Sequence, residues 1–177
     1  MKNLDEIQTQ LKELDCLIEP CSDADQKGLY KIYHEVISAG TNYPHDDESP
    51  EGFQNCVFAK GAYVYVCKSK GEVIGGFNLK PNFPGRGKHI ANAVYMLQKS
   101  VRGKGIGKLL VEASLAVAKE IGYKGIQFNL VLSQNQPAVN LYKKVGFEIL
   151  GTIPNAIRNN NGSYQSGYIM YKSLCQD

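Results

Sequence analysis

Apolar residues in the first quarter of the chain recur mostly at helical spacing. Between positions 4 and 14 they repeat every three or four residues, which predicts a short amphipathic helix. Residues 16–20 fit a first strand, and an aspartate at 23 or 25 is expected to cap a second helix that runs to about Ala39. After a loop, another short helix is expected beyond Pro50.

A period of two replaces the helical period from Ala62 onward. The segments "AYVYVCK" and "VIGGFNLK", separated by the turn "SKGE", predict a β-hairpin. The loop "PNFPGRGKH" then leads to a third extended run over residues 90–97. Because short connections join these three strands, we expect them to pair antiparallel.

Helices and strands alternate in the second half of the chain. Apolar residues from 106 to 121 keep the spacing of an amphipathic helix, which Gly122 ends. The nearly continuous apolar run "GIQFNLVLS" predicts a buried strand, and a second helix has Pro137 near its first turn and Gly146 just past its end. Two closing strands, "FEILGTI" and "SGYIMYKSL", flank the turn-rich "NNNGS". This order predicts a mixed α/β domain with helices on both faces of one sheet.

The composition is that of an ordinary globular protein and favours a small anionic ligand. The 177 residues fit a single domain over 1–177, with 43% hydrophobic residues, 21% charged residues and a net charge of +3. This mild charge suits a small anion better than nucleic acid, which calls for a concentrated basic face. A core of this size needs no structural metal, and we expect no metal site.

The cysteines and the hydropathy pattern indicate the cellular compartment in which the protein is expected. The five cysteines form no C-x-x-C pair, and their odd number argues against a closed disulfide framework. The first residues are charged, and no apolar run approaches the roughly 18 residues needed to span a bilayer. We therefore expect a cytoplasmic protein with reduced thiols and no membrane partner.

The stretch "VRGKGIGKLL", residues 101–110, concentrates glycines and cations at the start of the predicted long helix. Glycines let backbone N–H groups approach a ligand closely, and the cations favour an anionic ligand. A loop of the type G-x-x-x-x-G-K-[ST] is excluded, because Arg102 stands where its first glycine belongs and Leu109 replaces the hydroxyl residue. The dinucleotide fingerprint G-x-G-x-x-G fails as well, since residue 108 is a lysine.

The same stretch contains R-x-x-G-x-G, from Arg102 through Gly105 to Gly107, between a strand and a long helix. Further along, "NQPAVNLYKKVGF" has the spacing N-x-x-A-x-x-x-Y-x-x-x-G-F. Together the two segments resemble the GNAT superfamily of acetyl-CoA-dependent N-acetyltransferases. The resemblance implies the GNAT fold, a mostly antiparallel sheet of six or seven strands that splays apart at the cofactor site.

The resemblance also implies where acetyl-CoA binds as co-substrate. The glycine turn would wrap its diphosphate at the helix amino terminus, where unpaired N–H groups and the positive end of the helix dipole face it. The strand before the turn would pair with the pantetheine arm, and an N–H near Met96 or Leu97 would polarise the thioester carbonyl. The expected cofactor-binding residues are Met96, Leu97, Gln98, Arg102, Gly103, Lys104, Gly105, Ile106, Gly107, Lys108, Asn135 and Tyr142.

Tyr142 is also the expected catalytic residue. A phenol at its position resembles the family's general acid, which protonates the departing CoA thiolate, and its ordinary pKa of about 10 keeps it protonated at neutral pH. The general base stays open, because the strands "HIANAVYML" and "QFNLVLS" contain no Asp or Glu. The alternatives are His89, a bound water, or an amine that arrives already neutral.

Asn92 and Asn129 interrupt apolar strands, so each is either a satisfied core amide or, like His89, a polar group that holds the acceptor. The segments "FPGRGKHIANA" and "FNLV" resemble a branch of the superfamily that includes fungal acetyltransferases acting on proline-analogue amino acids. In that branch the corresponding asparagines are implicated in holding the small substrate. This sequence departs from the branch in carrying Tyr142 where the fungal enzymes have a different aromatic residue.

These observations predict an enzyme that moves an acetyl group from acetyl-CoA to the amine of a small molecule, such as an amino acid or analogue, by direct attack in a ternary complex. Acetylation of a protein amino terminus or of lysine is the alternative reaction. A non-catalytic acyl-CoA-binding module is a third interpretation, against which Tyr142 argues because a pure binder needs no proton donor. We expect a monomer or a homodimer.

Overall fold

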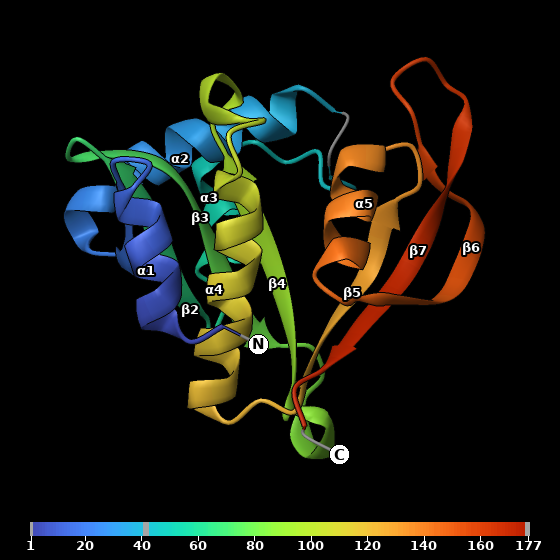
Figure 1. The fold of residues 1–177 in the computed structure, drawn as a ribbon. Coiled ribbons are helices and arrows are strands. Elements are labelled where there is room, and N and C mark those ends of the chain that lie inside the picture. The colour runs from blue at the N-terminus through green and yellow to red at the C-terminus, as the bar shows by residue number, and fades with distance from the viewer. Residues whose placement is uncertain (1, 41–42, 176–177) are drawn as a thin grey trace.

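A single seven-stranded sheet organises residues 2–40 and 43–175, the part of the chain described by the computed structural model (Figure 1). Its order is β1-β2-β3-β4-β5-β7-β6, and β4 and β5 form the parallel pair among otherwise antiparallel neighbours. This confirms the predicted sheet of six or seven mostly antiparallel strands. The strands are β1 (Cys16–Pro20), β2 (Tyr63–Ser69), β3 (Glu72–Pro81), β4 (Ile90–Leu97), β5 (Gly125–Leu132), β6 (Glu148–Arg158) and β7 (Tyr164–Ser173).

The α-helices cover both faces of the sheet, as predicted (Figure 1). They are α1 (Leu4–Lys12), α2 (Asp23–Ser38), α3 (Pro50–Val57), α4 (Ile106–Ile121) and α5 (Gln136–Lys144). α1 and α4 contribute Ile7 and Leu110 to a core that includes Phe77 of β3. On the opposite face, α2 and α3 form a second core that includes Met96 of β4. Two short 3-10 turns, η1 (Gly85–Gly87) and η2 (Lys99–Val101), flank β4.

The start of α2 differs slightly from the prediction. Ser22, rather than an aspartate at 23 or 25, is the residue that caps the helix. Asp25 is the third residue of the first turn, and its carboxylate accepts hydrogen bonds from the Ser22 backbone N–H at 3.0 Å and from the Ser22 hydroxyl at 2.7 Å. The reciprocal capping box therefore sets the helix start, and the carboxylate supports it from inside the first turn.

β4 and β5 separate shortly after they begin. They pair through Ile90 with Gly125 and Ala91 with Ile126, and beyond these residues the two strands diverge (Figure 1). β5 continues its pairing with β7 on the other side. The expected splay is therefore present, and it leaves the outer half of β4 with a free edge that faces β5 across a gap.

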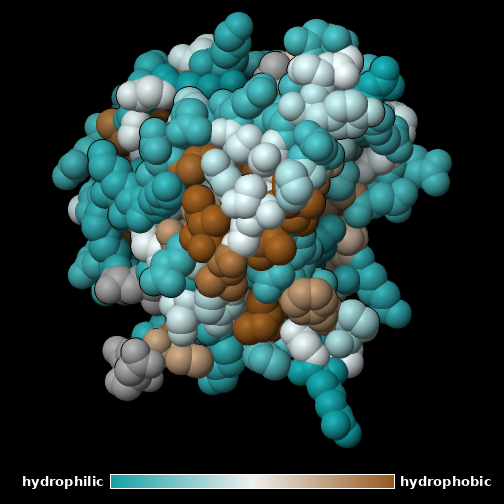
Figure 2. All heavy atoms as spheres, turned by 90° about the vertical axis from the view of Figure 1, so that its right-hand side faces the viewer, coloured by the Kyte–Doolittle hydropathy of each residue, from teal (hydrophilic) through white to brown (hydrophobic). Residues whose placement is uncertain are grey.

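The two closing strands form the predicted hairpin, but they enter the sheet in an order that the sequence did not indicate. β7 lies between β5 and β6, so β6 becomes the edge. Leu150 and Ile153 of β6 are exposed, and Figure 2, which faces this side of the molecule, shows apolar side chains gathered near its centre. The oligomeric state, expected to be a monomer or a homodimer, stays a prediction. In the described part of the chain, no helix has the length and apolar character needed to cross a membrane.

Candidate active site

A cavity of about 960 Å³ occupies the gap between β4 and β5. Its wall combines the free edge of β4, the outer half of β5, the first turn of α4, the first residues of α5 and the loop that follows α2. The charged side chains that line it are all basic or potentially basic: His45, Lys80, Arg102 and Lys108. A cavity of one sign with low-dielectric walls concentrates anions.

The glycine turn forms one end of the cavity. Gly103 and Gly105 have φ angles of 80° and 86°, a left-handed conformation that favours glycine. A side chain added at either position would meet nothing within 4 Å, so the cavity reaches the backbone itself. Gly105 is also the N-cap of α4 and provides no side chain to cap the helix. The Lys108 N–H donates to the Gly105 carbonyl oxygen at 3.0 Å, whereas the N–H groups of Ile106 and Gly107 are open to an anionic ligand.

Two cations stand beside this turn. Arg102 donates from Nε to the Leu97 carbonyl oxygen at 3.1 Å, which ties the turn to the end of β4. Lys108 lies in the first turn of α4 and makes a 3.5 Å ion pair with Glu112. Both side chains line the cavity, so positive charge accompanies the exposed backbone N–H groups.

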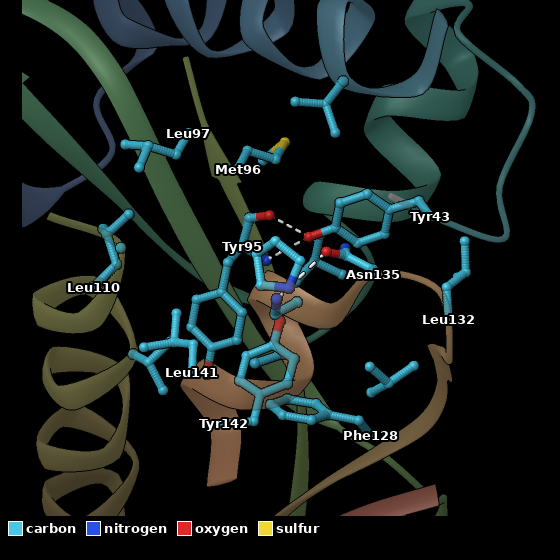
Figure 3. Close-up of a pocket in the computed structure, with 18 of the residues that line it drawn as sticks. Tyr43, Tyr95, Met96, Leu97, Leu110, Phe128, Leu132, Asn135, Leu141 and Tyr142 are labelled. Atoms are coloured by element: carbon cyan, nitrogen blue, oxygen red, sulfur yellow. Dashed lines mark hydrogen bonds between the residues drawn. The ribbon is translucent and has the colours of Figure 1, made fainter. Parts of the chain in front are cut away.

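At the edge of β4 that faces the gap, the backbone of Tyr95 forms hydrogen bonds with the hydroxyl of Tyr43, a residue that the sequence analysis did not single out. Tyr43, in the loop after α2, accepts a 3.0 Å hydrogen bond from the Tyr95 backbone N–H and donates to the Tyr95 carbonyl oxygen (Figure 3). Burial raises the pKa of the Tyr43 hydroxyl well above its usual value. One hydroxyl group thus satisfies both backbone polar groups of Tyr95 in the gap.

Strand alternation shows which other backbone groups of β4 face this gap. The Gln98 N–H donates to the Ile74 carbonyl of β3 at 2.9 Å, so Gln98 is directed away from the cavity. Since alternate residues of a strand point their peptide groups to opposite sides, Met96 faces β3 as well, and Leu97 shares the side of Tyr95. Of the two N–H groups predicted near the thioester, Leu97 is therefore the one on the correct edge.

Tyr142 projects from α5 into the middle of the cavity (Figure 3). Its ring lies 4.6 Å from that of Phe128 and 6.0 Å from that of Tyr95, measured between centroids. Burial raises the pKa of the Tyr142 hydroxyl, which makes the neutral phenol the stable form. No other described residue forms a hydrogen bond with this hydroxyl group. It is thus free to donate a proton to a ligand.

A cluster of amides lines the far end of the cavity, and Asn82 is its centre. The Asn82 Oδ1 accepts from Nδ2 of Asn92 at 3.1 Å and from Nδ2 of Asn129 at 2.7 Å. Asn82 Nδ2 in turn donates to Asn129 Oδ1 at 3.0 Å, an oxygen that Gln127 also contacts at 3.0 Å. Asn92 is half-buried and Asn129 is exposed, so these amides belong to the cavity wall and not to the core.

Eleven of the predicted site residues line the same cavity: Asn92, Met96, Leu97, Arg102, Gly103, Gly105, Gly107, Lys108, Asn129, Asn135 and Tyr142. Four do not. Gln98 pairs with β3, Lys104 is exposed, and the Ile106 side chain is buried in the core at 3% exposure. His89 is exposed outside the cavity, where its Nδ1 lies 3.0 Å from the Arg86 carbonyl oxygen.

Sequence reasoning also overlooked four residues that line the far half of the cavity: Tyr43, His45, Lys80 and Asn82. Tyr43 and His45 come from the loop "TNYPHDDESP", which has no periodicity to mark inward positions. Lys80 and Asn82 flank Pro81 at the end of β3. The one available signal was the predicted antiparallel pairing, which places the end of this strand beside Asn92.

Comparisons with known proteins match this arrangement. The sequence model described as the Acetyltransferase (GNAT) family matches residues 28–147. The N-acetyltransferase aca1 of Schizosaccharomyces pombe is 39% identical over 101 residues, 56% of this chain and 48% of that protein. The peptidyl-lysine N-acetyltransferase YjaB of Escherichia coli is 42% identical over 55 residues, 31% of this chain and 33% of that protein. This chain thus spans about half of aca1 and a third of YjaB.

A solved structure extends the likeness over nearly the whole chain. The GCN5-related N-acetyltransferase from Kribbella flavida superimposes with a TM-score of 0.84 at 29% identity, covering 91% of this chain and 99% of that one. Since the family model covers well over half of the residues, and the parted sheet and glycine turn are those that the family resemblance implies, the assignment is direct. The chain belongs to the GNAT family of acetyltransferases.

Proposed function

We propose that this protein transfers an acetyl group from acetyl-CoA to the amine of a small molecule, an amino acid or analogue, in a ternary complex. One observation carries the proposal: the glycine turn of α4 and the free edge of β4 open into the same cavity. A long ligand with a diphosphate at one end and amides along its arm has complementary partners along this path.

In this proposal the diphosphate of acetyl-CoA lies at the α4 amino terminus, against the N–H groups that follow Gly105 and beside Arg102 and Lys108. The pantetheine arm pairs with the free edge of β4, where the backbone of Leu97 faces the gap. Asn135 lines the same cavity while its side chain caps α5 by accepting from the Ala138 N–H at 3.3 Å. Its role toward the cofactor is therefore to hold α5 beside the arm.

The reaction joins the acceptor nitrogen to the acetyl carbon and breaks the carbon–sulfur bond. Tyr142 then gives its proton to the departing thiolate, for which the buried neutral phenol is suited. No Asp or Glu lines the cavity among the described residues. The amine proton passes to water or to His45, whose pKa is lowered by burial and by the charge of Lys80, so that its imidazole is neutral near pH 7.

Thiol release tests the proposal directly. The protein is incubated with acetyl-CoA and a panel of amino acids, polyamines, aminoglycosides and peptides, and free CoA is measured. We expect saturable binding of acetyl-CoA and turnover with small amines. If acetyl-CoA binds and no amine in the panel is acetylated, the protein is an acyl-CoA-binding module; if acetyl-CoA does not bind, the proposal fails entirely.

A protein acceptor is the second candidate, because YjaB is named as a peptidyl-lysine N-acetyltransferase. In this alternative a lysine side chain or a protein amino terminus enters the far end of the cavity. The same assay separates the two, since a protein acetyltransferase would turn over peptides at least about 100-fold more efficiently than free amino acids, a difference of roughly 2.7 kcal/mol in transition-state binding.

A further inference from the structure

Two lysines of the sheet differ in how their charge is compensated. Lys68 of β2 is half-buried and contacts two carboxylates, Asp25 at 2.7 Å and Glu19 at 2.6 Å. Those hydrogen bonds raise the pKa of Lys68, and the contacts from Lys68 and Ser22 outweigh the effect of burial and lower the pKa of Asp25. The fold thus neutralises a partly buried ammonium group at this position.

Lys80 of β3 is also half-buried, but it has no such partner. Its Nζ donates to the Cys56 carbonyl oxygen at 3.4 Å, near the end of α3, and no described carboxylate forms an ion pair with it. An ammonium group withdrawn from water without a counter-charge is unfavourable. Because Lys80 lines the cavity, an anion in the cavity can provide the missing charge.

The position of Lys80 in the sheet brings it beside the amide cluster. Lys80 is the direct cross-strand partner of Asn92 on β4, and paired residues of antiparallel strands project from the same face of the sheet. Asn92 and Asn129 both donate to Asn82, and each amide nitrogen carries a second N–H. One ammonium group and several amide N–H donors, with no carboxylate among the described lining residues, match a carboxylate ligand.

The other basic residues that line the cavity do not provide positive charge beside the amide cluster. Arg102 and Lys108 lie at the glycine turn, where the proposed function already uses them for the diphosphate. The imidazole of His45 lines the cavity with Lys80, and its pKa is lowered first by burial and then by the charge of Lys80. His45 is therefore neutral near pH 7, and it does not provide a cation at this end of the cavity.

We infer that Lys80 selects for the carboxylate of the acceptor: its ammonium group pairs with that carboxylate beside Asn92 and Asn129, so that an amino acid is preferred over the amine that lacks the carboxylate. The inference rests on the proposed function and identifies Lys80 as a specificity-determining residue. It has a chemical consequence as well. The positive charge of Lys80 disfavours the ammonium form of a nearby acceptor amine, which helps to produce the neutral nucleophile in a cavity whose described lining includes no carboxylate.

The test compares binding and turnover for three matched ligands: an amino acid, its carboxamide, and the amine formed by removing its carboxylate. Binding to the protein saturated with CoA is measured by calorimetry, which needs no turnover. We expect the wild-type protein to bind the amino acid about 10- to 100-fold more tightly than the other two, as for a charge-assisted hydrogen bond. Lys80→Met should remove this preference and Lys80→Arg should restore part of it.

Lys60→Met is the control, because Lys60 is exposed and lies outside the cavity lining. Affinity for acetyl-CoA should be unchanged in both methionine variants, and their melting temperatures show whether they fold. Equal affinity of the wild-type protein for all three ligands would overturn the inference, as would an unaltered preference in Lys80→Met. If amines are still acetylated, either result contradicts only the inference about Lys80 and leaves the proposed function intact. If the protein prefers the carboxylate ligand but releases no thiol from acetyl-CoA, that result contradicts only the proposed function.

Discussion

The two ends of the cavity are built in different ways. The glycine-turn end comes from one continuous segment, residues 95–108, and it offers mainly backbone N–H groups and two cations. The far end, which we call the acceptor end because we propose that the acceptor binds there, combines side chains from three separate places: the loop after α2, the end of β3 with the facing part of β4, and β5. Recognition through the backbone is thus encoded locally, whereas recognition through side chains depends on the assembled sheet.

The largest expected effect comes from Gly105→Glu at the glycine-turn end. The left-handed φ of 86° disfavours any side chain, and the new carboxylate would face the proposed diphosphate. We expect affinity for acetyl-CoA to fall by about 100-fold or more, measured by calorimetry. Gly71→Glu is a matched control, since Gly71 also has a positive φ of 82° and open space around it but lies in the β2–β3 turn. An equal loss in both variants would show that the effect is strain and not ligand contact.

Tyr142→Phe should separate chemistry from binding. Loss of the general acid is expected to lower kcat by about 100-fold, while the affinity for acetyl-CoA stays within about 2-fold. Because burial raises the pKa of Tyr142, the wild-type rate should show no decline from its ionisation up to about pH 10. Tyr164→Phe, on the exposed surface of β7, provides the control. An unchanged kcat in Tyr142→Phe would remove the general-acid assignment.

The amide cluster makes the acceptor end sensitive to a residue that need not touch the substrate. Asn82 holds both Asn92 and Asn129, so Asn82→Ala should raise the acceptor KM by about 5- to 20-fold through their misplacement. Its effect should not add to that of Asn129→Ala, because both remove the same interaction. Asn140→Ala on the exposed side of α5 is the control. Strict additivity in the double variant would show that the two amides act independently.

The smallest expected effect has the opposite sign. Tyr43→Phe removes the hydroxyl that satisfies the Tyr95 N–H and carbonyl groups. If the cofactor arm replaces that hydroxyl, the variant should bind acetyl-CoA about 3- to 10-fold more tightly, because binding no longer has to break these two hydrogen bonds. Affinity is measured by calorimetry under the same conditions for both proteins. Weaker binding by the variant would mean instead that the phenol contacts the cofactor.

The sequence predicts the features that a single segment encodes, and it does not predict those that depend on the assembled sheet. The helices and strands were predictable because each has its own period or cap, and β1 and α4 begin and end within a residue of the expected positions. The position of β7 between β5 and β6 was not predictable from the sequence. The orders β5-β7-β6 and β5-β6-β7 bury the same alternating residues, so the hydrophobic pattern does not distinguish them. Asn92 and Asn129 stood out as polar residues in apolar strands. Their partner Asn82 did not, because an asparagine beside a proline in a loop is ordinary.

Amide hydrogen exchange with and without saturating acetyl-CoA tests the central claim most directly, because it reports on the backbone groups that are proposed to hold the cofactor. Slower exchange is predicted at residues 103–108, which form the glycine turn and the start of α4, and at the two N–H groups of β4 that face the gap, those of Tyr95 and Leu97. Little change is expected in β6 and β7. Saturable binding with protection confined to any other part of the chain would contradict the account.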